Sequence, residues 1–95
     1  MLFLSDVSIW EICLKWRAKK LLLPSTPRQW VDEQTRQWAI KPLGIERRHL
    51  YRTTELEDIH PDPFDRTLVA QAIEEDCRIV TPDAQIAKYA VSVVW

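Results

Sequence analysis

Three acidic residues that lie far apart in the chain are the strongest candidates for chemistry: Glu11, Asp65 and Asp83. Carboxylates that converge repel one another unless a divalent cation neutralises them. Oxygen ligands suit Mg²⁺ or Mn²⁺, and such ions activate water for attack on a phosphodiester. The residue types therefore permit a metal-dependent hydrolytic site, and the elements that carry the three acids decide whether they meet.

Asp65 has the most informative position of the three. In the helix predicted over residues 64–75 the apolar side chains share one face, and Asp65 falls inside that face. A carboxylate in such a place is costly unless it is hydrogen-bonded or meets a cation. The structural alternative is that Asp62 caps the helix, Pro63 forms its first turn and Asp65 lies near the positive helix end. That alternative explains why an acid is tolerated there, but not why it points inward.

Glu11 and Asp83 each have a functional and a structural interpretation, and both remain open. Glu11 lies at the border of the apolar arc of its predicted helix, where an exposed ion pair with Lys15 at spacing i, i+4 is the alternative. Asp83 follows the predicted strand 78–81, and ligand crevices of parallel sheets lie at the carboxyl ends of strands. Its alternative role is to cap the short helix that follows. Asp6 is interpreted as a cap.

Strand and helix patterns alternate along the chain, which predicts one α/β domain, residues 1–95, with a parallel sheet and flanking helices. Strands are expected at residues 1–4, 38–45, 78–81 and 91–94, and helices at residues 7–19, 27–37, 46–55, 64–75 and 83–89. The first helix has a very wide apolar arc and should be buried on more than one side. Helix 46–55 should turn Leu50 and Tyr51 inward. Helix caps are predicted at Ser5–Asp6, Thr26 and Asp62.

Composition sets limits on partners and location. A net charge of −1 gives no overall attraction to nucleic acid or to an anionic membrane. RNA binding would depend on local basic residues such as Lys15 and Arg66, which need no ligand if they only form solvated helix faces. No apolar run approaches the roughly 20 residues needed to span a bilayer, and the opening residues are too short for a signal peptide. We therefore expect a cytoplasmic protein without a membrane partner.

Cysteine, histidine and tryptophan carry weaker signals. Cys13 and Cys77 form no metal-binding motif and are expected to be buried free thiols. His49 and His60 have no metal-ligand spacing and are interpreted as incidental. Five tryptophans indicate large apolar faces, and aromatic residues are enriched at interfaces between chains.

Four segments follow one another in an order and spacing that resemble a known family. Residues 8–15 (SIWEICLK) resemble S-x-W-E-I-x-x-K, and residues 60–72 (HPDPFDRTLVAQA) resemble H-x-D-P-F-D-R-x-L-x-A-Q-A, of PIN domains in one group of VapC-like toxins. Residues 80–83 (VTPD) and 91–95 (VSVVW) resemble the closing V-T-x-D and V-x-V-x-W of that group. The resemblance covers essentially the whole chain.

The resemblance implies a metal-dependent endoribonuclease, commonly a toxin restrained by a cognate antitoxin. It implies that Glu11, Asp65 and Asp83 bind Mg²⁺ or Mn²⁺ and that Asp62 and Thr81 support them. The alternative is a non-catalytic PIN remnant that binds an antitoxin or a PIN protein through its helices.

One departure from the family pattern affects both alternatives. PIN domains of this group begin with a central strand that ends in a metal-binding aspartate, and this chain starts after it. The chain therefore resembles an N-terminally truncated, partial PIN domain with impaired activity. Its strands would close up, pair with a strand of a separate polypeptide, or pair with a second copy. We favour a homo-oligomer formed through exposed strand edges.

Overall fold

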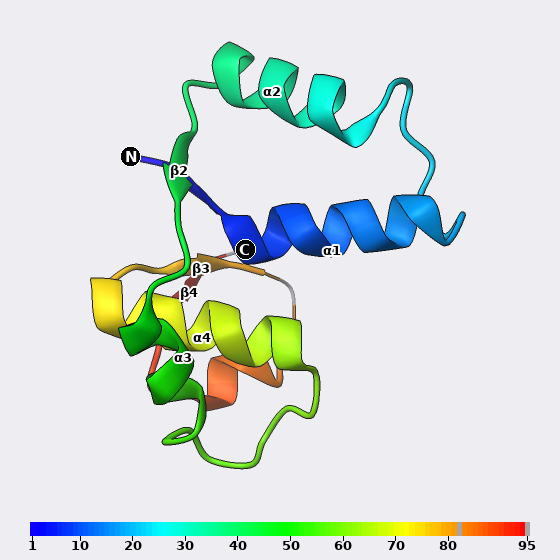
Figure 1. Ribbon diagram of the computed structural model, residues 1–95. Coiled ribbons are helices and arrows are strands. Elements are labelled where there is room, and N and C mark those ends of the chain that lie inside the picture. Colours follow the sequence, from blue (N-terminus) through cyan, green and yellow to red (C-terminus); the bar gives the residue numbers. More distant parts are fainter. Residues whose placement is uncertain (82, 95) are drawn as a thin grey trace. The chain divides into compact units, whose positions relative to one another are not determined.

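A computed structural model describes residues 1–81 and 83–94. The chain divides into two compact units, Met1–Gly44 and Ile45–Trp95, whose helices α1 to α4 are labelled in Figure 1. Strands and helices occur in both units, which confirms the predicted α/β class. Within the described residues, no helix is both long and apolar enough to cross a membrane.

The N-terminal unit contains β1 (Phe3–Ser5), α1 (Asp6–Arg17), α2 (Pro27–Gln37) and β2 (Lys41–Leu43). β1 and β2 pair in parallel, with Ser5 opposite Leu43. Pro42 stands in the middle of β2, where its missing N–H is tolerated because β1 is the only strand paired with β2 among the described residues. α1 and α2 are in contact and run in opposite directions (Figure 1).

Side-chain caps fix the starts of these two helices. The Ser5 hydroxyl accepts a hydrogen bond from the Val7 N–H at 3.1 Å, and the Thr26 hydroxyl accepts one from the Gln29 N–H at 3.3 Å. Both caps were predicted from the sequence. At the first helix, however, Ser5 is the cap and Asp6 is the first helical residue.

Left-handed residues close three of the helices. Lys19, Ala39 and Asp76 have φ angles of 61°, 52° and 52°, and each follows the end of a helix. Glycine is the usual residue at such a position, but the chain contains only one glycine. At the end of α2 this closure also uses residues 38–40, with the Ile40 N–H bonded to the Thr35 carbonyl at 2.9 Å. The strand predicted at 38–45 is therefore reduced to Lys41–Leu43.

The C-terminal unit contains α3 (Arg47–Thr53), α4 (Pro63–Glu75), β3 (Ile79–Val80), a 3₁₀ turn η1 (Ile86–Lys88) and β4 (Val93–Val94). β3 pairs in parallel with β4. α4 is the central element, because four consecutive residues, Val69 to Ala72, are buried and together point in all directions around the helix. Its core consists of Val69, Ile86 and Tyr89, against which Leu56, Ile59, Ile73, Ile79 and Val91 pack.

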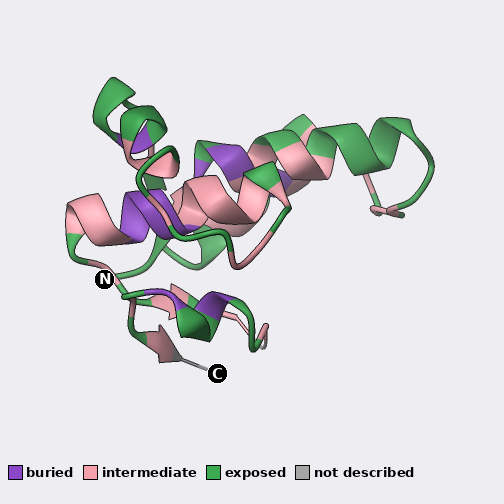
Figure 2. Ribbon diagram, turned by 90° about the horizontal axis from the view of Figure 1, so that it is seen from below, coloured by how far each residue is buried: buried purple, intermediate pink, exposed green. Residues whose placement is uncertain are grey.

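Buried residues occupy only short stretches of the chain (Figure 2), and three expectations about burial are wrong. In α1 only Val7 is buried and Trp10 is 58% exposed, so this helix is not buried on several sides. In α3 both Leu50 and Tyr51 are exposed, and His49 is the buried residue. The cysteines are free as predicted, but Cys13 is exposed and Cys77 is only partly buried.

Candidate functional site

The start of α4 carries the first acid of the candidate site. The Asp62 carboxylate caps the helix by accepting a hydrogen bond from the Phe64 N–H at 2.8 Å, and Pro63 is the first helical residue. Asp65 therefore sits at the third helical position, where unpaired backbone N–H groups favour a negative charge. Its side chain is 24% exposed.

His60 connects this helix start to the segment after β3. Its Nε2 atom lies 3.1 Å from Asp65 Oδ2 and 3.0 Å from Asp83 Oδ2. Its Nδ1 atom accepts a hydrogen bond from the Asp62 N–H at 3.1 Å, and its own backbone N–H donates to the Tyr89 hydroxyl at 2.8 Å. The ring is 13% exposed. The inward direction of Asp65 thus has a partner, because its Oδ2 atom lies 3.1 Å from the ring nitrogen Nε2.

Asp83 is held by one hydrogen bond from its backbone and one to its side chain. Its N–H donates to the Thr81 hydroxyl at 3.1 Å, and its Oδ1 atom accepts from the Gln85 N–H at 2.8 Å. The bond from Gln85 is the main reason, followed by the bond from His60, why the pKa of the Asp83 carboxyl lies below its usual range. Asp83 is therefore ionised at neutral pH. The expected helix cap at Asp83 is not formed, because Gln85 stands at the start of η1 without a side-chain cap bond, and the Asp83–Gln85 contact forms a local turn before it.

Arg66 fixes the loop that carries His60. Its guanidinium donates to the carbonyl oxygens of Thr53 at 2.8 Å, Glu57 at 3.0 Å and His60 at 3.4 Å, and to the Tyr89 hydroxyl at 3.2 Å. These bonds give Arg66 a structural task that the sequence did not indicate. Its contact with RNA stays a prediction.

The result is a compact group of three side chains. One ligand-type atom from each of His60, Asp65 and Asp83 lies within 4.8 Å of the others. The sequence predicts Asp65 and Asp83 as site residues but not His60, which has no metal-ligand spacing. The signal that could have found it is its place two residues before the helix cap, where its ring can accept the Asp62 N–H.

Glu11 belongs to α1 of the N-terminal unit. It forms the i, i+4 ion pair with Lys15 that the structural interpretation expected, at 3.1 Å between Oε2 and Nζ. The Glu11 side chain is 25% exposed and that of Lys15 is 55% exposed. Convergence of Glu11 with the other two acids stays a prediction, as does an RNA contact of Lys15.

A second group of titratable side chains ties α3 to α4. His49 is fully buried, its Nδ1 accepts from the Glu46 N–H at 2.9 Å, and its Nε2 lies 2.9 Å from Glu75 Oε1. Arg48 forms ion pairs with both Glu46 and Glu75. The bond from His49, followed by the charge of Arg48, lowers the pKa of Glu75. Because a guanidinium already neutralises these carboxylates, the group is a structural tie rather than a cation site.

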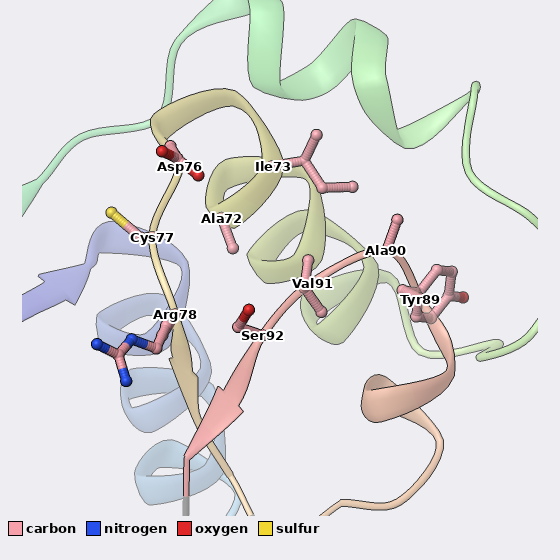
Figure 3. Close-up of a pocket in the computed structure, with 9 residues that line it drawn as sticks. All are labelled: Ala72, Ile73, Asp76, Cys77, Arg78, Tyr89, Ala90, Val91 and Ser92. Carbon is pink, nitrogen blue, oxygen red and sulfur yellow. The ribbon is translucent and has the colours of Figure 1, made fainter.

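A hollow of about 530 Å³ lies at the other end of α4. Figure 3 shows its lining, with Ala72 and Ile73 of α4 on one side and Val91 and Ser92 on the other, and with Arg78 at its margin. Its lining contains no cluster of carboxylates, so it offers no alternative place for a divalent cation.

The chain belongs to the PIN domain family, because the family model of the PIN domain matches residues 1–92. The predicted PIN domain is thereby confirmed, and membership indicates a nuclease-type function in general, of a kind that generally depends on divalent metal ions. No curated protein and no solved structure matches the chain.

Proposed function

We propose that this PIN domain is a VapC-like endoribonuclease that uses Mg²⁺ or Mn²⁺ held by Asp65 and Asp83. The observation that carries the proposal is the convergence of two carboxylate oxygens on one ring nitrogen, at 3.1 and 3.0 Å. Both side chains keep part of their surface exposed, 24% for Asp65 and 35% for Asp83, so an ion and a phosphate can reach them. Carboxylate oxygens are the donors that Mg²⁺ and Mn²⁺ prefer.

Each residue of the proposed site has a defined role. When bound, the cation would supply positive charge for the scissile phosphate and activate water. Asp65 and Asp83 hold that charge in place, and Glu11 is the proposed third ligand. Asp62 and Thr81 support the two ligands, Asp62 by capping α4 and Thr81 by accepting the Asp83 N–H.

Replacement of either acid tests this function. Asp65→Asn and Asp83→Asn keep the size of the side chain but remove its charge, so cleavage of single-stranded RNA in Mg²⁺ should fall by about 100-fold or more. Asp76→Asn is the matched control, because Asp76 is exposed at the opposite end of α4 and asparagine tolerates its left-handed backbone. Equal cleavage by all three variants would contradict the proposal.

Exposed apolar side chains favour a second candidate function, that of a non-catalytic module that binds an antitoxin or a second copy of the chain. Trp10 is 58% and Leu14 is 44% exposed, one helical turn apart on α1. In addition, β1 and β3 each have a single strand partner among the described residues, which leaves strand edges for pairing.

The second candidate predicts a dimer and no catalytic role for the acids. Light scattering should give twice the mass of the chain, and Trp10→Gln with Leu14→Gln should shift that mass toward the monomer. A monomer at all concentrations would contradict self-association. Dimerisation of a wild type that cleaves no RNA in Mg²⁺ or Mn²⁺ would favour the module over the enzyme.

A further inference from the structure

We infer that His60 is the positioning residue of the cation site: it holds Asp65 and Asp83 together as a hydrogen-bond donor and is not itself a metal ligand. The inference rests on the proposed function insofar as it concerns a cation at the two acids. It starts from the fact that one ring atom, Nε2, is within 3.1 Å of both carboxylates.

The position of the ring proton follows from the other side of the imidazole. The Asp62 N–H points at His60 Nδ1 at 3.1 Å, and a backbone N–H can only donate. Nδ1 must therefore be the acceptor nitrogen, and the ring carries its proton on Nε2. To bind a cation through Nε2, the ring would have to move this proton to Nδ1, where it would face the Asp62 N–H, donor against donor.

The ring also has little freedom to turn away from the acids. The His60 backbone is fixed on both sides, since its N–H donates to the Tyr89 hydroxyl at 2.8 Å and its carbonyl accepts from Arg66 at 3.4 Å. Tyr89 is buried in the core and the His60 side chain is 13% exposed. Core packing therefore determines where the Nε2–H group points.

A hydrogen-bond donor between the two carboxylates lowers the free-energy cost of holding them close together. Two carboxylates repel each other, and a shared N–H offsets that repulsion and selects one rotamer of each side chain. It also leaves part of the Asp83 carboxylate open to another partner. A carboxylate offers about four acceptor positions. The Asp83 carboxylate accepts from the Gln85 N–H on Oδ1 and from His60 on Oδ2, and the Ile86 N–H is a further donor to it. An acceptor position of Asp83 thus remains for a cation, and outer partners of this kind are typically worth 10-fold to 100-fold in metal affinity.

Two substitutions separate the donor from the rest of the ring. In His60→Gln the amide nitrogen reaches the place of Nε2, so a donor to the acids is kept. In His60→Asn the amide oxygen takes the place of Nδ1 and still accepts the Asp62 N–H, but the donor to the acids is lost. Circular dichroism and thermal melting would confirm that both variants fold.

Calorimetry and nitrogen-15 NMR of the full chain test the inference. Mg²⁺ should bind His60→Asn about 10-fold more weakly than the wild type, and His60→Gln should restore most of that loss. The His60 ring should show the Nε2–H form both without and with Mg²⁺. Equal Mg²⁺ affinity in His60→Asn and wild type, or an Nδ1–H ring with a cation-shifted Nε2, would overturn the inference while leaving the proposed function intact. No Mg²⁺ or Mn²⁺ binding to a wild type that shows the Nε2–H form would instead overturn the proposed function and leave the donor role standing.

Discussion

The two units of the chain are stabilised in different ways. Among the described residues, seven of the ten buried residues belong to the C-terminal unit, while eight of the twelve large exposed apolar residues belong to the N-terminal unit. The C-terminal unit has a core around Val69, Ile86 and Tyr89. The N-terminal unit depends on helix caps and one pair of three-residue strands.

This difference indicates that a site of closely spaced carboxylates needs a buried core to hold it, which the C-terminal unit has. Holding two carboxylates close together is costly, and the surrounding structure has to supply that free energy. In the C-terminal unit the core does so, because Tyr89 is buried and its hydroxyl fixes the backbone of His60. Glu11, in the unit with few buried residues, has a surface ion pair instead, of a kind worth a few tenths of a kcal/mol.

The largest effect on stability is expected from Arg66, the polar centre of the C-terminal unit. Arg66→Ala removes its hydrogen bonds to the carbonyl oxygens of Thr53, Glu57 and His60 and should lower the free energy of unfolding by about 3 kcal/mol. Urea denaturation measures the change. Arg47→Ala, at an exposed arginine of α3, is the control, and an equal effect of both would break the comparison.

Two valines compare the packing of the units directly. Val69 is completely buried in the C-terminal core, so Val69→Ala should cost about 2 kcal/mol. Val31 is 6% exposed in the N-terminal unit, where fewer buried neighbours surround it, and Val31→Ala should cost about half as much. Chemical denaturation of both variants checks the order. A larger loss in Val31→Ala would show that the N-terminal unit has the better-packed core.

Acid should weaken the C-terminal unit first. Glu75 and Asp83 both have pKa values below their usual range, because His49 and Gln85, respectively, donate to the ionised carboxylates. A lowered native pKa adds stability above the unfolded pKa, and this is lost as the pH falls through the native value, below about pH 4. Hydrogen exchange followed from pH 6 to pH 3 should show α4 losing protection in that window. Glu75→Gln should make the loss shallower, and a loss centred near pH 6 would contradict the assignment.

The smallest effect concerns a helix end of the N-terminal unit. Ala39 has a φ of 52° and closes α2, a conformation that costs a residue with a Cβ atom about 1 kcal/mol. Ala39→Gly should therefore stabilise the unit by about 0.5–1 kcal/mol, partly offset by the greater freedom of unfolded glycine. The matched control is Ala18→Gly, at a residue with φ −79°, which should destabilise. Thermal melting checks both variants: the melting temperature should rise in Ala39→Gly and fall in Ala18→Gly.

Local signals in the sequence were sufficient for the starts of α1, α2 and α4 and for the PIN family. Ser5, Thr26 and Asp62 each place a hydroxyl or carboxylate two or three residues before an N–H that it can accept, and the structure shows those bonds. The last predicted helix, 83–89, shrinks to the three residues of η1. The Asp83 carboxylate takes the Gln85 N–H, and such local bonds compete with helix formation.

The histidines could not be predicted for a physical reason. Burial of His49 depends on the Glu46 N–H and on Glu75, which is 26 residues away, and the place of His60 depends on Asp83, 23 residues away. Neither spacing follows a helical or strand period, so only the tertiary fold reveals these partners. The exposed face of α1 was missed for a related reason, because an apolar arc indicates what can be buried but not whether the chain supplies a cover.

Diffraction from crystals soaked in Mn²⁺, measured at a wavelength where manganese scatters anomalously, tests the central claim most directly. The account predicts an anomalous peak within about 2.0–2.3 Å of oxygen atoms of both Asp65 and Asp83, with the His60 ring outside the coordination shell. A fully occupied peak elsewhere, or no peak at the two carboxylates in crystals that hold Mn²⁺, would contradict it.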